Sequence, residues 1–169
     1  MRLLVDATPL YNLGQIGELD LLVVPAVELV IPTAVAEEID IEPAATNLDR
    51  FLDENDVTTE PDIEESLDDA KGLLDEDATT SDVVIVAVML AARDRDEALS
   101  LVSEDTRLRA IADGLGVAVT SSFGLTVRGS LDDKYFSINQ AKRVIRRMDH
   151  HGVQMTGQLR ERAVGEVDS

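Results

Sequence analysis

Four acidic residues stand beside the apolar segments that this chain would use to build a parallel α/β sheet. They are Asp6, Glu38, Asp82 and Asp105. The apolar segments beside them are, in the same order, residues 3–5, 31–35, 83–92 and 98–103. Carboxylates brought into one pocket can bind Mg²⁺ or Mn²⁺ and drive the hydrolysis of phosphodiester bonds. These four residues are therefore the candidate catalytic and metal-binding set.

Abundance alone does not single these acids out, because 34 of the 169 residues are Asp or Glu. Their position beside buried segments is what distinguishes them. Three of them also have a purely structural explanation: the helix dipole favours Asp82 in a first turn, Asp105 could cap the helix that follows it, and Glu38 could be solvated beside Glu37. Asp6 is the hardest to explain in this way, because an acid directly after a buried strand is costly without a partner.

The charge of the chain is strongly acidic and unevenly distributed. The formal net charge is -19; residues 1–92 carry 22 acids and 3 bases, whereas residues 93–169 carry 12 of each. Few lysines and few aromatic residues accompany this excess, a composition typical of proteins from salt-loving organisms. At about 1 M salt the Debye length is roughly 3 Å, so the acidic charge would not exclude a nucleic-acid substrate.

Length and composition favour a single globular domain with its own core. Cysteine is absent, which excludes disulfides and cysteine metal sites and leaves oxygen ligands with His150 and His151. The histidine pair is a weak candidate for a metal site, because adjacent residues do not share a helix face. We find no amino-terminal signal pattern and no apolar run near the roughly 20 residues that span a bilayer, so we expect a cytoplasmic protein with no membrane contact.

The hydrophobic pattern predicts alternating strands and helices. We expect strands at residues 3–5, 98–103 and 117–120, with further apolar segments at 21–24 and 27–31. One helix is expected to begin at Thr8-Pro9 with Thr8 as its cap, and a second to begin at Pro32-Thr33 and carry Glu37 and Glu38. Two more are expected at residues 82–93, after a cap at 79–81, and at 107–115. Residues 40–80 predict peripheral helices. This order favours a central parallel sheet with helices on both faces, at whose carboxyl edge Asp6 and Asp105 would meet Glu38 and Asp82.

Two series of ordered motifs in the chain carry a family resemblance. The resemblance begins with Leu4-Val5-Asp6-Ala7-Thr8-Pro9-Leu10 and continues through residues 14–17, 21–22, 31–32 and 35–38. It resumes at Ser81-Asp82-Val83-Val84-Ile85, Leu101-Val102-Ser103-Glu104-Asp105, 109–112 and 116–117. These motifs resemble the PIN domain family, the ribonuclease fold of VapC-like toxins. The resemblance implies a PIN-like three-layer α/β sandwich. It places the PIN core at residues 1–130, with an acidic helical insert at about 40–80, and leaves residues 131–169 as a C-terminal helical extension packed on the same domain.

The resemblance also implies a function. It predicts a Mg²⁺- or Mn²⁺-dependent endoribonuclease in which Asp6, Glu38, Asp82 and Asp105 are the metal-binding and catalytic acids and Thr8 and Ser103 are supporting hydroxyls. Toxins of this family imply an RNA substrate, a small antitoxin partner and a homodimer. The alternative is a PIN-fold binding or assembly protein with weak or no nuclease activity. The chain departs from the family pattern at Ser121-Ser122-Phe123-Gly124, and Glu37 and Glu104 are rival acids beside Glu38 and Asp105.

Basic residues add candidates for substrate contact. Arg107 and Arg109 follow Asp105 and could bind RNA phosphates, although a solvated helix face explains them equally well. Lys142-Arg143 and Arg146-Arg147 surround apolar positions and predict an amphipathic helix with a basic face, suited to RNA, to an antitoxin, to a second subunit or to simple packing. One more short helix is expected at residues 159–167.

Overall fold

The structure is a computed structural model, and it describes residues 1–23, 27–131 and 137–150. In these residues a sheet of five parallel strands has the order β3-β2-β1-β4-β5. The strands are β1 (Arg2–Val5), β2 (Glu28–Val30), β3 (Val57–Thr58), β4 (Leu99–Val102) and β5 (Ala118–Thr120).

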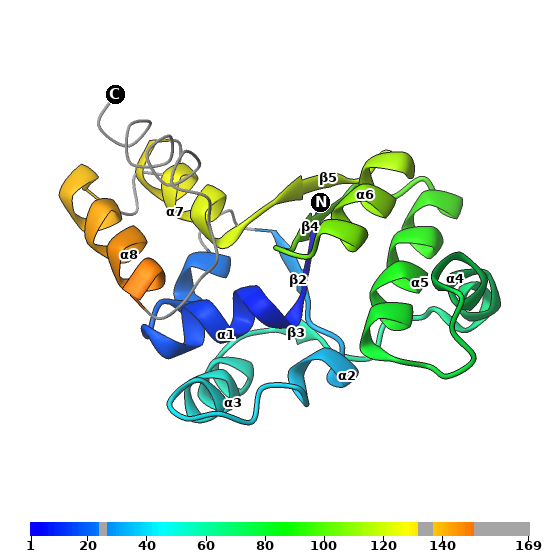
Figure 1. Ribbon diagram of the computed structural model, residues 1–169, viewed down its shortest axis with the longest axis horizontal. Coiled ribbons are helices and arrows are strands. Elements are labelled where there is room, and N and C mark those ends of the chain that lie inside the picture. Colours follow the sequence, from blue (N-terminus) through cyan, green and yellow to red (C-terminus); the bar gives the residue numbers. More distant parts are fainter. Residues whose placement is uncertain (24–26, 132–136, 151–169) are drawn as a thin grey trace.

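Helices cover both faces of this sheet. On one side lie α1 (Ala7–Gln15), α3 (Ala44–Glu54), α7 (Ser122–Leu131) and α8 (Ile138–His150); on the other lie α4 (Leu67–Leu74), α5 (Ser81–Asp94) and α6 (Thr106–Gly114) (Figure 1). The shorter elements are the helix α2 (Thr33–Ala36) and the 3₁₀ turns η1 (Leu19–Leu22) and η2 (Glu64–Ser66). The predicted three-layer α/β sandwich is confirmed.

The direction of winding reverses beside β1. From β1 the chain moves outward to β2 and β3, then crosses back to β4 on the other side of β1 and continues to β5. The last pair of the β1–β4 ladder joins Val5 to Val102, so the residues after both strands emerge side by side at the carboxyl edge. In open parallel sheets, ligands bind outside the carboxyl ends of the strands at such a reversal.

The core explains why these segments form these elements. Leu3, Leu4 and Val5 of β1 are buried, as is all of β4, because helices cover both faces of the sheet. Helix α5 is buried continuously from Val83 to Ala92, since it packs against α4 and α6 as well as the sheet. Its first turn is capped by Thr80, whose Oγ1 accepts a hydrogen bond from the Val83 N–H at 3.2 Å. The predicted α5 helix and its cap are therefore confirmed.

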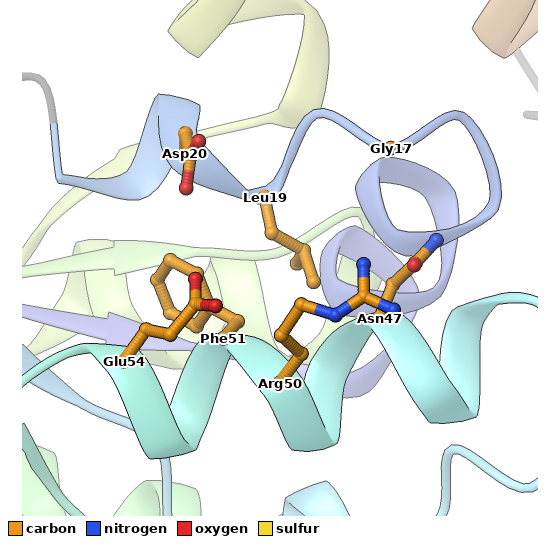
Figure 2. Close-up of a pocket in the computed structure, with 7 residues that line it drawn as sticks. All are labelled: Gly17, Leu19, Asp20, Asn47, Arg50, Phe51 and Glu54. Atoms are coloured by element: carbon orange, nitrogen blue, oxygen red, sulfur yellow. The ribbon is translucent and has the colours of Figure 1, made fainter.

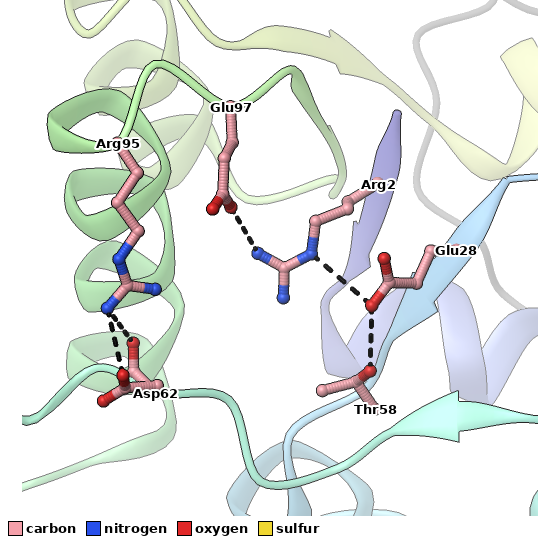
Figure 3. A network of polar contacts seen from close by, with 6 residues as sticks. All are labelled: Arg2, Glu28, Thr58, Asp62, Arg95 and Glu97. Carbon is pink, nitrogen blue, oxygen red and sulfur yellow. Dashed lines mark hydrogen bonds and ion pairs between the residues drawn. The ribbon is translucent and has the colours of Figure 1, made fainter.

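Polar contacts fasten the opposite, amino-terminal edge of the sheet (Figure 3). Arg2 on β1 lies 3.1 Å from Glu97 before β4 and 3.8 Å from Glu28 on β2. The Thr58 hydroxyl of β3 donates to the same Glu28 carboxylate at 3.2 Å. These contacts join three strands and the turn before β4 at the edge away from the acids.

The first helix begins differently from the prediction. Its cap is Asp6, not Thr8: the Asp6 Oδ1 accepts a hydrogen bond from the Ala7 N–H at 2.7 Å, and the helix starts at Ala7. Pro9 then lies within the first turn of α1. Backbone N–H groups in a first turn have no partner inside the helix, so proline, which lacks an N–H, is tolerated there. The acid is thus both the end of β1 and the start of α1.

Two predictions between β2 and α5 are also corrected. Helix α2 is a single turn that ends at Ala36, so Glu37 is its C-cap and Glu38 lies in the following turn. Residues 40–80 contain α3 and α4 as predicted, but also the edge strand β3, which pairs Leu29 with Val57 and Val30 with Thr58. Strand β3 was not predicted because its two residues are half-buried and too few to form a hydrophobic pattern. They form a strand only by pairing with the backbone of β2.

Helix α8, the last helix within the described residues, is amphipathic, as its pattern predicted. Ala141, Val144, Ile145 and Met148 are buried, and α8 packs on α7. Arg147 donates a hydrogen bond to the Ile16 carbonyl and lies 3.6 Å from Glu18. His151 and the helix predicted at residues 159–167 lie outside the described residues. Across the described part of the chain, no helix has both the length and the apolar character that bilayer crossing requires.

Candidate active site

Asp6 is a buried carboxylate at the reversal of the sheet. Its residue is only 6% exposed. The pKa of Asp6 is raised from an ordinary value of 3.8 to about 6. Burial is the main cause, the negative charges of Asp82 and Asp105 add to it, and the hydrogen bonds to Ala7 and Ser103 oppose it. Asp82 and Asp105 are therefore close enough for their charges to act on Asp6.

Ser103 connects two of these acids. The buried Ser103 hydroxyl donates a hydrogen bond to Asp6 Oδ2 at 2.8 Å and accepts one from the Asp105 N–H at 3.0 Å. Asp105 is the N-cap of α6, and its Oδ1 accepts from the Leu108 N–H at 2.9 Å. The structural explanation of Asp105 as a cap is therefore correct, and the charge of this capping carboxylate also acts on Asp6.

Asp82 projects from the first turn of α5 and pairs with Arg107. The Arg107 Nη2 donates to Asp82 Oδ2 at 3.1 Å, and about half of the arginine side chain is exposed. The ion pair joins α5 to α6. Sequence patterns indicated that Arg107 could meet phosphate, but gave no sign that it also meets an acid of the site.

Glu38 stands apart from the other three acids. It is exposed, and its charge is not among those that raise the pKa of Asp6. Its Oε1 accepts a hydrogen bond from the Ser81 hydroxyl at 2.6 Å. Since Ser81 precedes Asp82, this bond holds Glu38 toward the start of α5. Sequence reasoning missed Ser81; the only signal was a hydroxyl residue directly before a predicted site acid.

The rival acid Glu104 has different partners. Its Oε1 accepts from the Ser122 N–H at 2.7 Å, at the start of α7. Burial raises the pKa of Glu104, and its hydrogen bonds to Ser122 and the Arg109 charge counteract that effect. Arg109 itself donates to the carbonyls of Ser103 and Thr120, at 2.6 and 3.3 Å. Its guanidinium therefore ties the ends of β4 and β5 together.

A groove of about 190 Å³ adjoins Glu38. Its walls come from the first half of α1 and the turn after α2: Ala7, Thr8, Tyr11, Glu38, Ile39, Asp40 and Ile41. Thr8, predicted as a supporting hydroxyl, is exposed here. A separate hollow of about 260 Å³ lies between η1 and α3, where Arg50, Phe51 and Glu54 face Leu19 (Figure 2). None of the four acids lines that second hollow.

The comparison with known families decides what this fold is. A family model described as a PIN domain matches residues 2–169. The chain belongs to the PIN domain family. No curated protein and no solved structure matches it. The PIN domain is a nuclease-type fold; its nucleases generally use divalent metal ions and bind RNA.

The donor chemistry of this PIN domain fits such a metal ion. Carboxylate oxygens are the ligands that Mg²⁺ and Mn²⁺ prefer. A buried Asp6 within range of two like charges is an arrangement that a cation would stabilise. In the described part of the chain, however, no three acidic or histidine side chains lie close enough together to form a ready-made cage. Side chains such as Asp82, which Arg107 holds, would have to turn toward a shared ion.

Proposed function

We propose that this PIN domain is a Mg²⁺- or Mn²⁺-dependent endoribonuclease that hydrolyses RNA phosphodiester bonds. One observation carries the proposal: the buried Asp6 carboxylate at the reversal of the sheet, with the charges of Asp82 and Asp105 close enough to raise its pKa. A carboxylate in that position needs a positive partner for stability at neutral pH. A divalent cation bound there meets this need.

Each acid has a distinct part in the proposal. Asp6, Asp82 and Asp105 hold the cation, and Ser103 fixes the orientation of Asp6 through the bond to its Oδ2. Glu38, held by Ser81, lies further out and completes the site on the side of the groove. A bound divalent ion supplies a lowered pKa for water and stabilises negative charge on the phosphate.

Substrate contact comes from arginines around the acids and from α8. Arg107 is half-exposed beside Asp82 and can form a forked contact with a phosphate. On α8, Arg143 and Arg146 are exposed while the other face of the helix is buried. In a chain of net charge -19 this basic face is suited to the RNA backbone. The groove beside Glu38, with Tyr11 in its wall, is suited to an unpaired base.

The physiological setting follows from the resemblance to VapC-like toxins. Under the proposal the protein acts as a homodimeric toxin that a small antitoxin neutralises. Co-expression with the product of an adjacent short reading frame should then yield a stable complex that no longer cleaves RNA. Failure to recover such a complex would remove the toxin role and leave the nuclease activity.

The experiment that tests the activity is RNA cleavage under defined metal conditions. End-labelled single-stranded RNA is incubated with the protein in high salt, with Mn²⁺, with Mg²⁺ or with a chelator. Internal cleavage is expected with either ion and none with the chelator. Equal cleavage with the chelator would contradict metal dependence, and no cleavage under any condition would favour a PIN-fold binding protein.

A further inference from the structure

Arg107 occupies an unusual position for a positively charged residue. It lies in the first turn of α6, directly after the N-terminal residue Thr106. The helix dipole places partial positive charge at that end, so an arginine there is disfavoured by the helix itself. A compensating contact is therefore expected, and the structure provides one: Nη2 of Arg107 lies 3.1 Å from Oδ2 of Asp82.

The second arginine of this turn has a different contact. Arg109 directs its Nη1 at the backbone carbonyls of Ser103 and Thr120. Arg107 therefore holds the carboxylate of Asp82, whose charge raises the pKa of Asp6, while Arg109 holds the backbone. The Arg107–Asp82 pair is partly exposed, with side-chain exposures of 51% and 32%, so it is weak enough to be exchanged for another partner.

We propose that Arg107 is an internal counter-cation: it competes with the divalent metal ion for Asp82 and, once displaced, binds an RNA phosphate. This inference rests on the proposed function. A guanidinium and a metal ion both require the negative charge of Asp82, so each weakens the binding of the other. The same guanidinium is free to pair with phosphate when it leaves the carboxylate, because its planar fork fits both groups.

Metal and RNA therefore bind with positive coupling. A metal ion that releases Arg107 improves the site for phosphate, and phosphate that draws Arg107 away improves the site for metal. Thermodynamic linkage requires the two effects to be equal in size. Salt weakens the competition, because the pair is exposed to solvent.

The first test measures metal affinity directly, without RNA and without activity. Titration calorimetry with MnCl₂ compares wild type, Arg107→Gln and Arg107→Lys at the lowest salt concentration that keeps the protein folded. Arg107→Gln should bind Mn²⁺ about three- to fivefold more tightly, the factor expected for loss of one exposed ion pair. Arg107→Lys retains the charge and should remain close to wild type. Equal or weaker binding by Arg107→Gln would overturn the inference.

Two matched variants isolate the cause. Arg95→Gln removes the same charge from a comparable exposed pair, which Arg95 forms with Asp62 at 3.3 Å, and should leave Mn²⁺ affinity unchanged (Figure 3). In an Asp82→Asn background the advantage of Arg107→Gln should disappear. If Arg95→Gln has the same effect as Arg107→Gln, or if the advantage persists with Asp82→Asn, the tighter Mn²⁺ binding comes from the change in net charge. The proposed exchange at Asp82 would then be wrong.

The second test concerns the released guanidinium. At saturating Mn²⁺, Arg107→Gln should raise the KM for RNA several-fold with little change in kcat, and Arg107→Lys should restore part of it. An unchanged KM would contradict the phosphate contact. The metal titrations separate failure of this inference from failure of the proposed function. If Asp6→Asn abolishes Mn²⁺ binding but Arg107→Gln does not alter it, only the inference is refuted. If no variant binds Mn²⁺, the inference and the proposed function are both refuted.

Discussion

The hydroxyl of Ser103 donates a 2.8 Å hydrogen bond to Oδ2 of Asp6, joining the residues that follow two adjacent strands of the sheet. The same oxygen accepts the Asp105 N–H at 3.0 Å. One buried hydroxyl thus fixes the orientation of Asp6 and the path of the chain into Asp105. The relationship exists because β1 and β4 are parallel neighbours in register at Val5 and Val102.

Ser103→Ala should therefore cost stability and metal affinity together. It leaves the buried Asp6 Oδ2 and the Asp105 N–H without this partner, which predicts a loss of about 1 to 3 kcal/mol in the free energy of unfolding. Denaturant unfolding and Mn²⁺ titration measure the two effects. The control is Ser100→Ala, at another buried serine of β4. Similar behaviour of the two variants would show that the Ser103 bond has no special role.

Asp6→Asn should stabilise the metal-free protein at neutral pH. Because the pKa of Asp6 in the folded protein is about 6, above the ordinary 3.8, ionisation of Asp6 opposes folding. The favourable effect of its proton is complete below about pH 4 and is lost as the pH rises through about 6. Asn cannot ionise, so the variant should gain up to about 3 kcal/mol above pH 7 and little near pH 4.

Thermal or denaturant unfolding against pH, in the presence of a chelator, measures that gain. Asp53→Asn, at an exposed acid of α3, is the control and should show no comparable pH dependence. A constant difference between Asp6→Asn and wild type from pH 4 to pH 8 would show that Asp6 does not titrate in this range.

The two arginines after Asp105 should differ in their effect on stability. Arg109→Leu removes the contacts to the Ser103 and Thr120 carbonyls that tie β4 to β5, and should cost about 1 to 2 kcal/mol in the free energy of unfolding. Arg107→Leu removes only an exposed ion pair and should cost less than about 1 kcal/mol. Urea midpoints measure both. A greater loss for Arg107→Leu would reverse the assignment of these residues.

Ser81→Ala should reduce activity without reducing stability. The Ser81 hydroxyl holds Glu38 at 2.6 Å, and both side chains lie near the surface. Loss of such an orienting contact predicts about ten- to a hundredfold lower kcat with an unchanged unfolding midpoint. Thr79→Ala changes a neighbouring exposed hydroxyl and serves as the control. Full activity of Ser81→Ala would show that the orientation of Glu38 does not matter for cleavage.

Much of the fold could be predicted because its strong signals are local. The buried runs of β1, α5 and β4 and the cap at Thr80 are visible in short stretches of sequence. The edge strand β3 could not be predicted, because its two residues form a strand only by pairing with β2. The cap of α1 was assigned to Thr8 because a hydroxyl before proline is a common helix start, whereas Asp6 has an equally suitable side chain two residues earlier.

The candidate site was less accessible from sequence. The topology of the sheet explains why Asp6 and Asp105 emerge together, but the contacts that orient the acids join residues far apart in the chain. Asp82 and Arg107 are 25 positions apart and Glu38 and Ser81 are 43 apart. Such pairs depend on how α5 packs against α6 and on the turn after α2. The spacing of residues along the sequence therefore does not predict these pairs.

The most direct test of the central claim is RNA cleavage by Asp6→Asn, measured with Mn²⁺ in high salt on protein that unfolding curves show to be folded. The buried carboxylate is proposed to hold the metal, so the variant should cleave at least about a hundredfold more slowly than wild type although it is more stable. That combination would separate loss of chemistry from loss of structure. Cleavage at the wild-type rate would contradict the account.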